Sequence, residues 1–342
     1  MIQRATSAVL AGVVFLGLSL ATVFSHAAED KWPSGPITTI VPFGAGGGMD
    51  MTARSLSEEM KKTLGVPMAV VNVTGGGGAI GMEQAYRQPK DGNTLFALSS
   101  AVCTYPATGL SKLTYKEFGL LGIAYEALPV YSVAYDSPIK TMNDLIQGLK
   151  KGGLTGSNSG FGGVWHVPQI IVNSTIGGNF KVVPYDGGAP SALAAAKKEV
   201  DFATCDVAEA QTYFREKLLR PLCVVDDKPF NLGGVGTIPP VTDFIPEMKD
   251  KLILAKGWRA VGYVKGIPKD RVEKLIQAFK TALATDMVKN FAAKNLLVIN
   301  GTTGAEADQI FAKTTQTLSW LLYDLKAAKR SPDELGIPRP GK

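Results

Sequence analysis

The sequence predicts an α/β protein made of two lobes. Short apolar runs alternate with amphipathic stretches along the chain, a pattern typical of α/β layers with mainly parallel sheets. Four turns rich in glycine or other small residues each separate an expected strand from an expected helix. The chain has 342 residues, which is long for one domain, so we expect two lobes.

The individual elements follow from the spacing of apolar residues. Short, mostly apolar runs predict strands at 37–41, 69–73, 94–98, 130–135, 182–184, 201–204 and 222–225. Helical spacing predicts helices at 51–64, 79–87, 142–150, 167–175, 191–198 and 209–217. After the apolar run 258–264, helices are expected at 269–285, 287–294 and 305–326, with helix-start patterns at 268–270 and 302–306. The Pro-rich tail from Ser331 on is expected to pack as an irregular strap.

The N-terminal residues predict a signal peptide. Arg4 precedes a largely apolar segment, 8–24, and the segment 25–27 has small residues at the two positions that a signal peptidase reads. We therefore expect cleavage after Ala27 and a secreted mature protein. The alternative is a membrane anchor, but the apolar run is short for a spanning helix. No cysteine directly follows the run, so the sequence does not support a lipoprotein anchor.

Charge and cysteine content argue against several classes of function. The net charge of +6 is spread along the chain without a basic run between aromatic residues, so nucleic acid is not an expected partner. Cys103, Cys205 and Cys223 would permit one disulfide, most plausibly 205–223, but we favour the interpretation that all three are buried thiols. No C-x-x-C motif occurs and no cysteine lies near His166, the one histidine of the mature chain, so we expect no metal and no cofactor.

The first two glycine-rich turns predict a site for an anion. Glycine lets the backbone approach a ligand, and the helix behind it adds the positive end of its dipole. Neither turn contains Lys, Arg or His, which favours recognition by backbone N–H groups. The second turn is 74–81, and the first consists of Phe43, Gly44, Ala45, Gly46, Gly47 and Gly48.

Two similar turns precede expected helices in the second half of the chain. If two of the four turns come from each lobe, they can face one another across a cleft. The segment 183–191 contains Tyr185, and the segment 154–165 contains Ser157, Ser159, Gly162 and Gly163.

Motifs for catalysis are not supported. Residues 76–81 fit G-x-G-x-x-G, but the acidic residue expected about 20 positions later is missing, and no P-loop motif occurs. No G-x-S-x-G motif accompanies His166, so we interpret it as a helix-start residue held by local hydrogen bonds. Asp206 has two open interpretations: its place at a strand end predicts a ligand crevice, and it also fits a helix N-cap.

Several segments together resemble one known family. In order, and over nearly the whole mature chain, they are similar to the receptors of tripartite tricarboxylate transporters, also called Bug proteins. The segments are 32–43, 46–50, 71–81, 91–95, 157–163, 183–185, 200–202 with Asp206, and 257–259.

The resemblance implies a fold like that of type II periplasmic binding proteins, with two α/β lobes, a cleft and a two-strand hinge. Lobe 1 would comprise residues 28–130 and 255–342, and lobe 2 residues 131–254. Relatives hold a ligand carboxylate with backbone N–H groups and waters, and the corresponding segments here are 43–48 and 157–163. Tyr185 and Asp206 match positions near the other end of the pocket.

The implied function is capture of a small mono-, di- or tricarboxylate in the periplasm and its delivery to a membrane permease, without catalysis and as a monomer. Alternatives are a carboxylate sensor that docks a signalling kinase and, less favoured, an enzyme of the same architecture. The chain departs from the family pattern at Gly162-Gly163, where Gly-Ser is usual, and at Asp186, where relatives often have Lys. Asp186 would place a second acid near the cleft.

Overall fold

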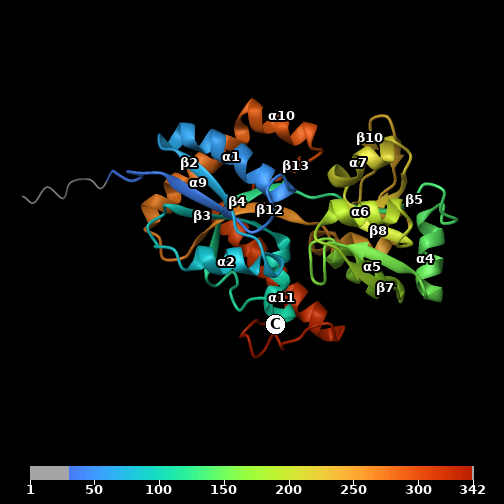
Figure 1. Ribbon diagram of the computed structural model, residues 1–342. Coiled ribbons are helices and arrows are strands. Elements are labelled where there is room, and N and C mark those ends of the chain that lie inside the picture. Colours follow the sequence, from blue (N-terminus) through green and yellow to red (C-terminus); the bar gives the residue numbers. More distant parts are fainter. Residues whose placement is uncertain (1–30, 341–342) are drawn as a thin grey trace, which may run out of the picture. The chain divides into compact units, whose positions relative to one another are not determined.

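The computed structural model describes residues 31–340, and most of them, from Pro33 on, belong to one compact unit. The predicted signal peptide, residues 1–27, lies outside the described residues, as does its cleavage site after Ala27. Two separate β-sheets organise the compact unit, and helices pack around each of them (Figure 1). The predicted fold class of two α/β lobes is confirmed.

The first sheet combines strands from the N-terminal and C-terminal parts of the compact unit. Its order is β13-β4-β12-β3-β1-β2. Strand β1 is parallel to both of its neighbours, β2 and β3, whereas β12 is antiparallel to its neighbours β3 and β4. The strands are β1 (Ile37–Val41), β2 (Met68–Asn72), β3 (Thr94–Ser99), β4 (Phe118–Glu126), β12 (Trp258–Val264) and β13 (Val298–Ile299).

The second sheet is formed by the middle of the chain. Its order is β7-β6-β8-β5-β9, with β6 parallel to β7 and β8 and with β5 antiparallel to β8 and β9. The strands are β5 (Pro129–Ala134), β6 (Thr155–Asn158), β7 (Lys181–Pro184), β8 (Phe202–Asp206) and β9 (Leu219–Val224). A separate hairpin joins β10 (Phe230–Leu232) to β11 (Gly236–Ile238).

The expectation of mainly parallel sheets was wrong, because both sheets are mixed. β12 comes from far along the chain and inserts between β3 and β4 against their direction. The strand β6 was also missed, because its sequence Thr-Gly-Ser-Asn contains no large apolar side chain. The ring of Phe202 fills the space where a side chain at Gly156 would lie, so a larger residue does not fit at this position of the strand. β4 was missed as well, although it is almost entirely buried.

The helices lie close to the predicted ranges, with one consistent difference at their starts. α1 begins at Gly48 instead of 51, and α6 begins at Gly188 instead of 191, so the glycine turns themselves form the first helical turn. The helices are α1 (Gly48–Leu64), α2 (Ala79–Tyr86), α3 (Tyr105–Thr108), α4 (Met142–Lys151), α5 (His166–Ile176), α6 (Gly188–Ala196), α7 (Val207–Arg215), α8 (Leu252–Ala255), α9 (Lys269–Ala284), α10 (Asp286–Lys294) and α11 (Gly304–Asp324), with 3-10 turns at Gly76–Gly78, Ser100–Thr104, Val241–Asp243 and Pro246–Lys251.

The C-terminal tail packs as an irregular strap, as expected. The buried side chain of Ile337 anchors it, and the Trp320 indole N–H donates to the Ile337 carbonyl at 3.1 Å. Lys116 Nζ donates to the Gly336 carbonyl at 2.8 Å. The tail is therefore held by specific backbone contacts although it forms neither helix nor strand.

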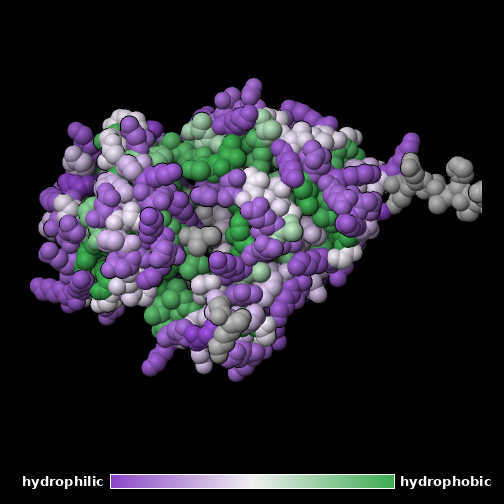
Figure 2. Space-filling model, turned by 180° about the vertical axis from the view of Figure 1, so that it is seen from behind, coloured by the Kyte–Doolittle hydropathy of each residue, from purple (hydrophilic) through white to green (hydrophobic). Residues whose placement is uncertain are grey.

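The three cysteines are free and buried, which confirms the favoured interpretation and not the disulfide. Burial raises the pKa of the Cys103 thiol to about 12, so it stays protonated at neutral pH. On the surface, hydrophilic side chains cover most of the face shown in Figure 2, with hydrophobic areas between them. Within residues 31–340, no helix is both long enough and apolar enough to cross a membrane.

Candidate functional site

All four small-residue turns lie at the carboxyl ends of parallel strands. Two follow strands of the first sheet and two follow strands of the second, which is the arrangement that the sequence predicted for a cleft. In α/β proteins this edge of a sheet is where ligands bind. We name them turn 1 (42–48, after β1), turn 2 (73–78, after β2), turn 3 (159–165, after β6) and turn 4 (185–187, after β7).

Turn 1 presents the start of α1 without a side-chain cap. Its N-cap, Gly47, makes no side-chain hydrogen bond, and the first amides of an α-helix have no partner within the helix. Gly46 N–H donates to the buried carboxylate of Asp50 at 2.9 Å, which fixes the turn. Turn 2 packs beside it: a Cβ at Gly78 would lie 3.3 Å from the Phe43 ring. The N–H groups of Gly46 and Gly47 are both bonded within the protein, so the donors that remain are the first amides of α1, at the positive end of this 17-residue helix.

Turn 3 uses most of its polar atoms internally. Gly162 N–H donates to His166 Nδ1 at 2.9 Å, and Gly163 N–H donates to the Gly160 carbonyl at 2.9 Å. Ser159 Oγ accepts from the Trp165 N–H at 3.1 Å. The predicted ligand role of Ser159, Gly162 and Gly163 stays a prediction, and it requires some of these bonds to be exchanged.

Two further contacts join turn 3 and the preceding strand, β6, to neighbouring elements. The hydroxyl of Thr104, at the end of the 3-10 turn after β3, donates to the Gly162 carbonyl at 2.7 Å and so links turn 3 to the first sheet's side. Ser157 is fully buried, and its Oγ donates to the Ser191 carbonyl at 2.9 Å. Ser157 thus joins β6 to α6.

His166 is a helix-start residue held by local hydrogen bonds, as predicted. It is the first residue of α5, and its Nδ1 accepts from the turn that precedes the helix. Burial lowers its pKa to about 4, so the ring is neutral at physiological pH.

The main residue that the sequence analysis missed is Arg259. It is the second residue of β12, and its neighbour Trp258 packs against Phe311 of α11 with ring centroids 5.8 Å apart. Adjacent strand residues point to opposite faces, so the arginine side chain extends toward α1. A Cβ at Gly48 would lie 2.9 Å from Arg259 Nη2 and 3.0 Å from its Cζ. The guanidinium therefore lies directly against the first residue of α1.

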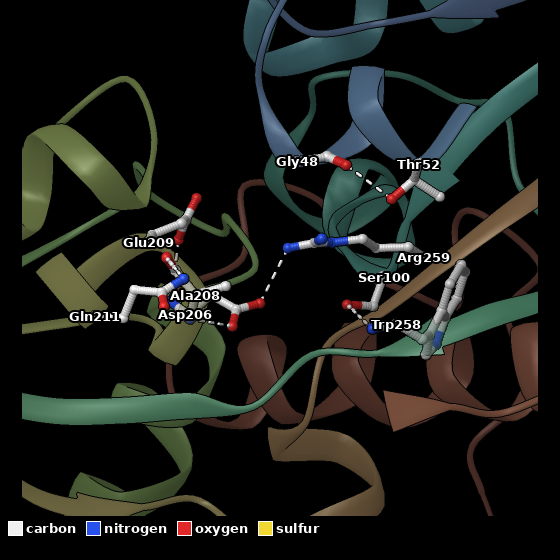
Figure 3. A network of polar contacts seen from close by, with 9 residues as sticks. All are labelled: Gly48, Thr52, Ser100, Asp206, Ala208, Glu209, Gln211, Trp258 and Arg259. Carbon is white, nitrogen blue, oxygen red and sulfur yellow. Dashed lines mark hydrogen bonds and ion pairs between the residues drawn. The ribbon is translucent and has the colours of Figure 1, made fainter. Parts of the chain in front are cut away.

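The same guanidinium reaches the second sheet. Arg259 Nη2 donates to Asp206 Oδ2 at 3.0 Å, and the two side chains are 9% and 1% exposed (Figure 3). Asp206 lies at the end of β8, so this buried ion pair connects residues of the two sheets. A guanidinium has five N–H donors, and in the described part of the chain Asp206 is its one hydrogen-bond partner.

Asp206 also caps a helix, which confirms one of its two interpretations, and its place in a ligand crevice stays a prediction. Its Oδ1 accepts from the Ala208 N–H at 3.0 Å, which makes it the N-cap of α7. Burial raises the pKa of Asp206, while the charge of Arg259 and the Ala208 amide oppose that rise.

Glu209 is a second acid beside Asp206, and its side chain is partly buried. Its Oε2 accepts from the Asp206 N–H at 3.0 Å, which completes a capping box at the start of α7. Burial, with a further contribution from the negative charge of Asp206, raises the pKa of Glu209 to about 7. Its carboxyl group lies against turn 4: Glu209 Cδ is 2.6 Å from the place that a Cβ of Gly188 would take, and Oε2 is closer.

With this geometry established, comparisons with known proteins identify the family. The model of the tripartite tricarboxylate transporter family receptor matches residues 52–317. The chain belongs to this family. It is 28% identical over 305 residues to a UPF0065 protein of Agrobacterium vitis, covering 87% of this chain and 86% of that one.

Two solved structures share the fold. MatC from Rhodopseudomonas palustris with bound malate is similar at 20% identity with a TM-score of 0.73, over 85% of this chain and 99% of that one. An R. palustris protein with adipate is similar at 21% identity with a TM-score of 0.70, over 90% of this chain and 99% of that one. The resemblance stated from the sequence motifs is therefore confirmed at the level of family and fold.

The Tyr185 hydroxyl, for which the sequence analysis predicted a ligand contact, bonds to another side chain of the protein. It donates to Glu199 Oε2 at 3.0 Å, and Glu199 is exposed. The predicted ligand role of Tyr185 stays a prediction, and it requires the hydroxyl to leave that partner. Within residues 31–340, no group of three or more His, Cys, Asp or Glu is placed to hold a metal ion.

The sequence contains a pattern that could have revealed each of the two missed residues, Glu209 and Arg259. The pattern Asp206-x-x-Glu209 is a readable capping box. An arginine inside the apolar run 258–264 indicates a buried cation that needs an acidic partner. Which acid pairs with it is not readable from the sequence, because Asp206 is 53 positions away.

Proposed function

We propose that this receptor binds a small organic acid between turns 1 and 3, in the periplasm, and delivers it to the membrane permease of a tripartite tricarboxylate-type transporter. Family membership supports this proposal, and two proteins of similar fold hold malate and adipate, which are small carboxylates. We further propose that the protein acts by binding alone, as a monomer, after removal of residues 1–27.

The observation that supports this function best is the set of groups that lie around Gly48. The uncapped amides of α1 and the guanidinium of Arg259 meet at this residue. Helix N-termini favour anions, and a guanidinium pairs with carboxylates through two parallel hydrogen bonds. A ligand carboxylate placed beside Gly48 would therefore meet backbone donors and a buried cation together. The proposed contacts of 43–48 with the ligand are backbone contacts, and Arg259 adds the charge.

Titration calorimetry of the mature chain tests the proposal. Linear mono-, di- and tricarboxylates are compared with matched amides and alcohols, after unfolding and refolding to remove any carried-over ligand. We expect binding of acids alone. Arg259→Lys keeps the charge but loses the planar fork, so we expect at least about tenfold weaker binding. Arg339→Gln is the matched control, because it removes an exposed pair with Asp324 far from the turns along the chain.

Three outcomes would contradict the proposal. If no acid binds the refolded wild-type protein, the receptor does not recognise organic acids. If acids bind but Arg259→Lys and Arg339→Gln affect binding equally, the carboxylate does not lie beside Gly48. Turnover of a bound acid by the pure protein would instead indicate an enzyme.

A further inference from the structure

The polar cluster between the two sheets has a positive side and a negative side. Arg259 and the start of α1 provide the positive side, on the first sheet. Asp206 and Glu209 provide the negative side, on the second sheet, and Figure 3 shows the guanidinium pointing toward them. An acid bound at Gly48 would therefore have its carboxylate near the cation and its far end toward the second sheet.

Turn 4, like turn 1, leads into a helix through a glycine N-cap, although the N-cap φ is +122° in turn 4 and −74° in turn 1. In turn 4 a carboxyl group of the protein lies beside the helix start. Its N-cap, Gly187, makes no side-chain hydrogen bond, and Gly188 is the first residue of α6. Glu209 lies where a side chain at Gly188 would be, and the Trp165 indole nitrogen lies 2.7 Å from the same point. A second ligand carboxylate directed at the amides of α6 would meet Glu209 already in that position.

The surrounding charges oppose a second carboxylate as well. Asp206 and Glu209 are adjacent, and Arg259 is the one cation paired with them among the described residues. Asp186 adds an exposed acid in turn 4 itself. A ligand carboxylate placed here would be repelled at short range by these acids. A hydroxyl or N–H group, in contrast, would find carboxylate oxygens that accept hydrogen bonds.

We propose that this receptor selects acids with one carboxylate and a hydrogen-bond donor at the far end, and that Glu209 is the residue that rejects a second carboxylate. This inference rests on the proposed function, because it assumes that the first carboxylate binds beside Gly48. It narrows the ligand from organic acids in general to ω-hydroxy or similar donor-terminated monocarboxylates.

Matched pairs of ligands test the inference by calorimetry at pH 8. The pairs are 4-hydroxybutanoate and succinate, 5-hydroxypentanoate and glutarate, and 6-hydroxyhexanoate and adipate. In the wild-type protein we expect the hydroxy acid of the binding pair to bind at least about tenfold tighter than the diacid. Glu209→Gln keeps the size and the accepting oxygen but removes the charge, so we expect it to reduce that ratio at least about threefold. Glu216→Gln removes an exposed carboxylate at the C-terminal end of α7 and should leave the ratio unchanged.

Each outcome decides a separate question. If no acid of any kind binds, the proposed function and this inference both fail. If acids bind and the diacid equals or exceeds its hydroxy partner in the wild-type protein, the proposed function stands and this inference is overturned, whether or not the Glu209 variant folds. If the preference is present and Glu209→Gln changes it no more than Glu216→Gln does, Glu209 is not the residue that sets it.

Discussion

Turns 1 and 4 both lead into a helix through a glycine N-cap, but their electrostatic surroundings are opposite. The N-caps also differ in backbone conformation, with a φ of −74° at Gly47 and +122° at Gly187. In each turn, a glycine N-cap precedes a glycine that begins a helix, and no side chain caps it. At Gly48 the space beyond the Cα holds the tip of Arg259, whereas at Gly188 it holds the carboxyl group of Glu209. The comparison shows that a glycine-rich helix start predicts only the possibility of an anion site. A side chain from a residue that is distant in the sequence lies against each helix start. The charge of that side chain decides whether the helix start can bind an anionic ligand.

The largest expected effect comes from removing Arg259, the cation beside turn 1. In Arg259→Ala the buried Asp206 loses its charged partner, and breaking a buried ion pair from one side costs about 3–5 kcal/mol of unfolding free energy. Arg339→Ala breaks an exposed pair with Asp324 and should cost about 0–1 kcal/mol. Urea unfolding at pH 7 measures both. Equal losses would show that the Arg259–Asp206 pair does not stabilise the folded state in water.

The double variant sharpens the same test. Asp206→Asn removes the charge that Arg259→Gln would leave unpaired, while an asparagine still caps a helix. We therefore expect the double variant to be more stable than Arg259→Gln alone. Independent, additive losses would mean that the two side chains do not interact.

Glu209 makes the stability of the protein depend on pH. Its folded-state pKa of about 7 lies above the ordinary carboxyl value, so the folded state holds a proton that the unfolded chain releases. Stability from this group is therefore fully present below about pH 4.3 and is lost as pH rises through 7, by up to about 3 kcal/mol. Glu209→Gln lacks this loss, so its advantage over the wild type should grow between pH 5 and 8.

His166 changes the stability of the protein with pH in the opposite direction to Glu209. The Glu209→Gln variant is therefore compared with the wild type at each pH. The folded-state pKa of His166, about 4, is lowered, and its contribution is lost as pH falls below about 6.5. It is unchanged in Glu209→Gln and cancels in the difference between the two unfolding curves. A difference that stays constant from pH 5 to 8 would contradict the raised pKa of Glu209.

Local features of the chain were predictable, and long-range pairings were not. The turns, most helices and Asp206 as a cap follow from spacing and residue type within about ten positions. The mixed sheets were not predictable, because β12 inserts between β3 and β4 from more than a hundred positions away. The same reason applies to the site: turn 1 is visible in the sequence, but its cation comes from β12. β6 escaped prediction because Phe202 of another strand supplies its bulk.

The smallest expected effects come from adding one methyl group at each helix start. Neither Gly48 nor Gly188 has a positive φ, so alanine changes only the space beyond the Cα. At Gly188 the added Cβ would collide with the Glu209 carboxyl group and the Trp165 indole, and such overpacking costs about 1–3 kcal/mol. At Gly48 it would meet the far end of a flexible arginine, so we expect a loss of stability under about 1 kcal/mol.

The two alanine variants should also differ in what else they change. Gly48→Ala pushes the Arg259 guanidinium away from α1, so it should weaken carboxylate binding by more than its small loss of stability suggests. Gly188→Ala displaces the acid that opposes a second carboxylate, so it should lower the preference for hydroxy acids and leave the first carboxylate bound. Urea unfolding and calorimetry on both variants measure these effects. If the two substitutions change stability and ligand preference alike, the opposite surroundings of the two turns have no functional consequence, and the glycines serve only the backbone.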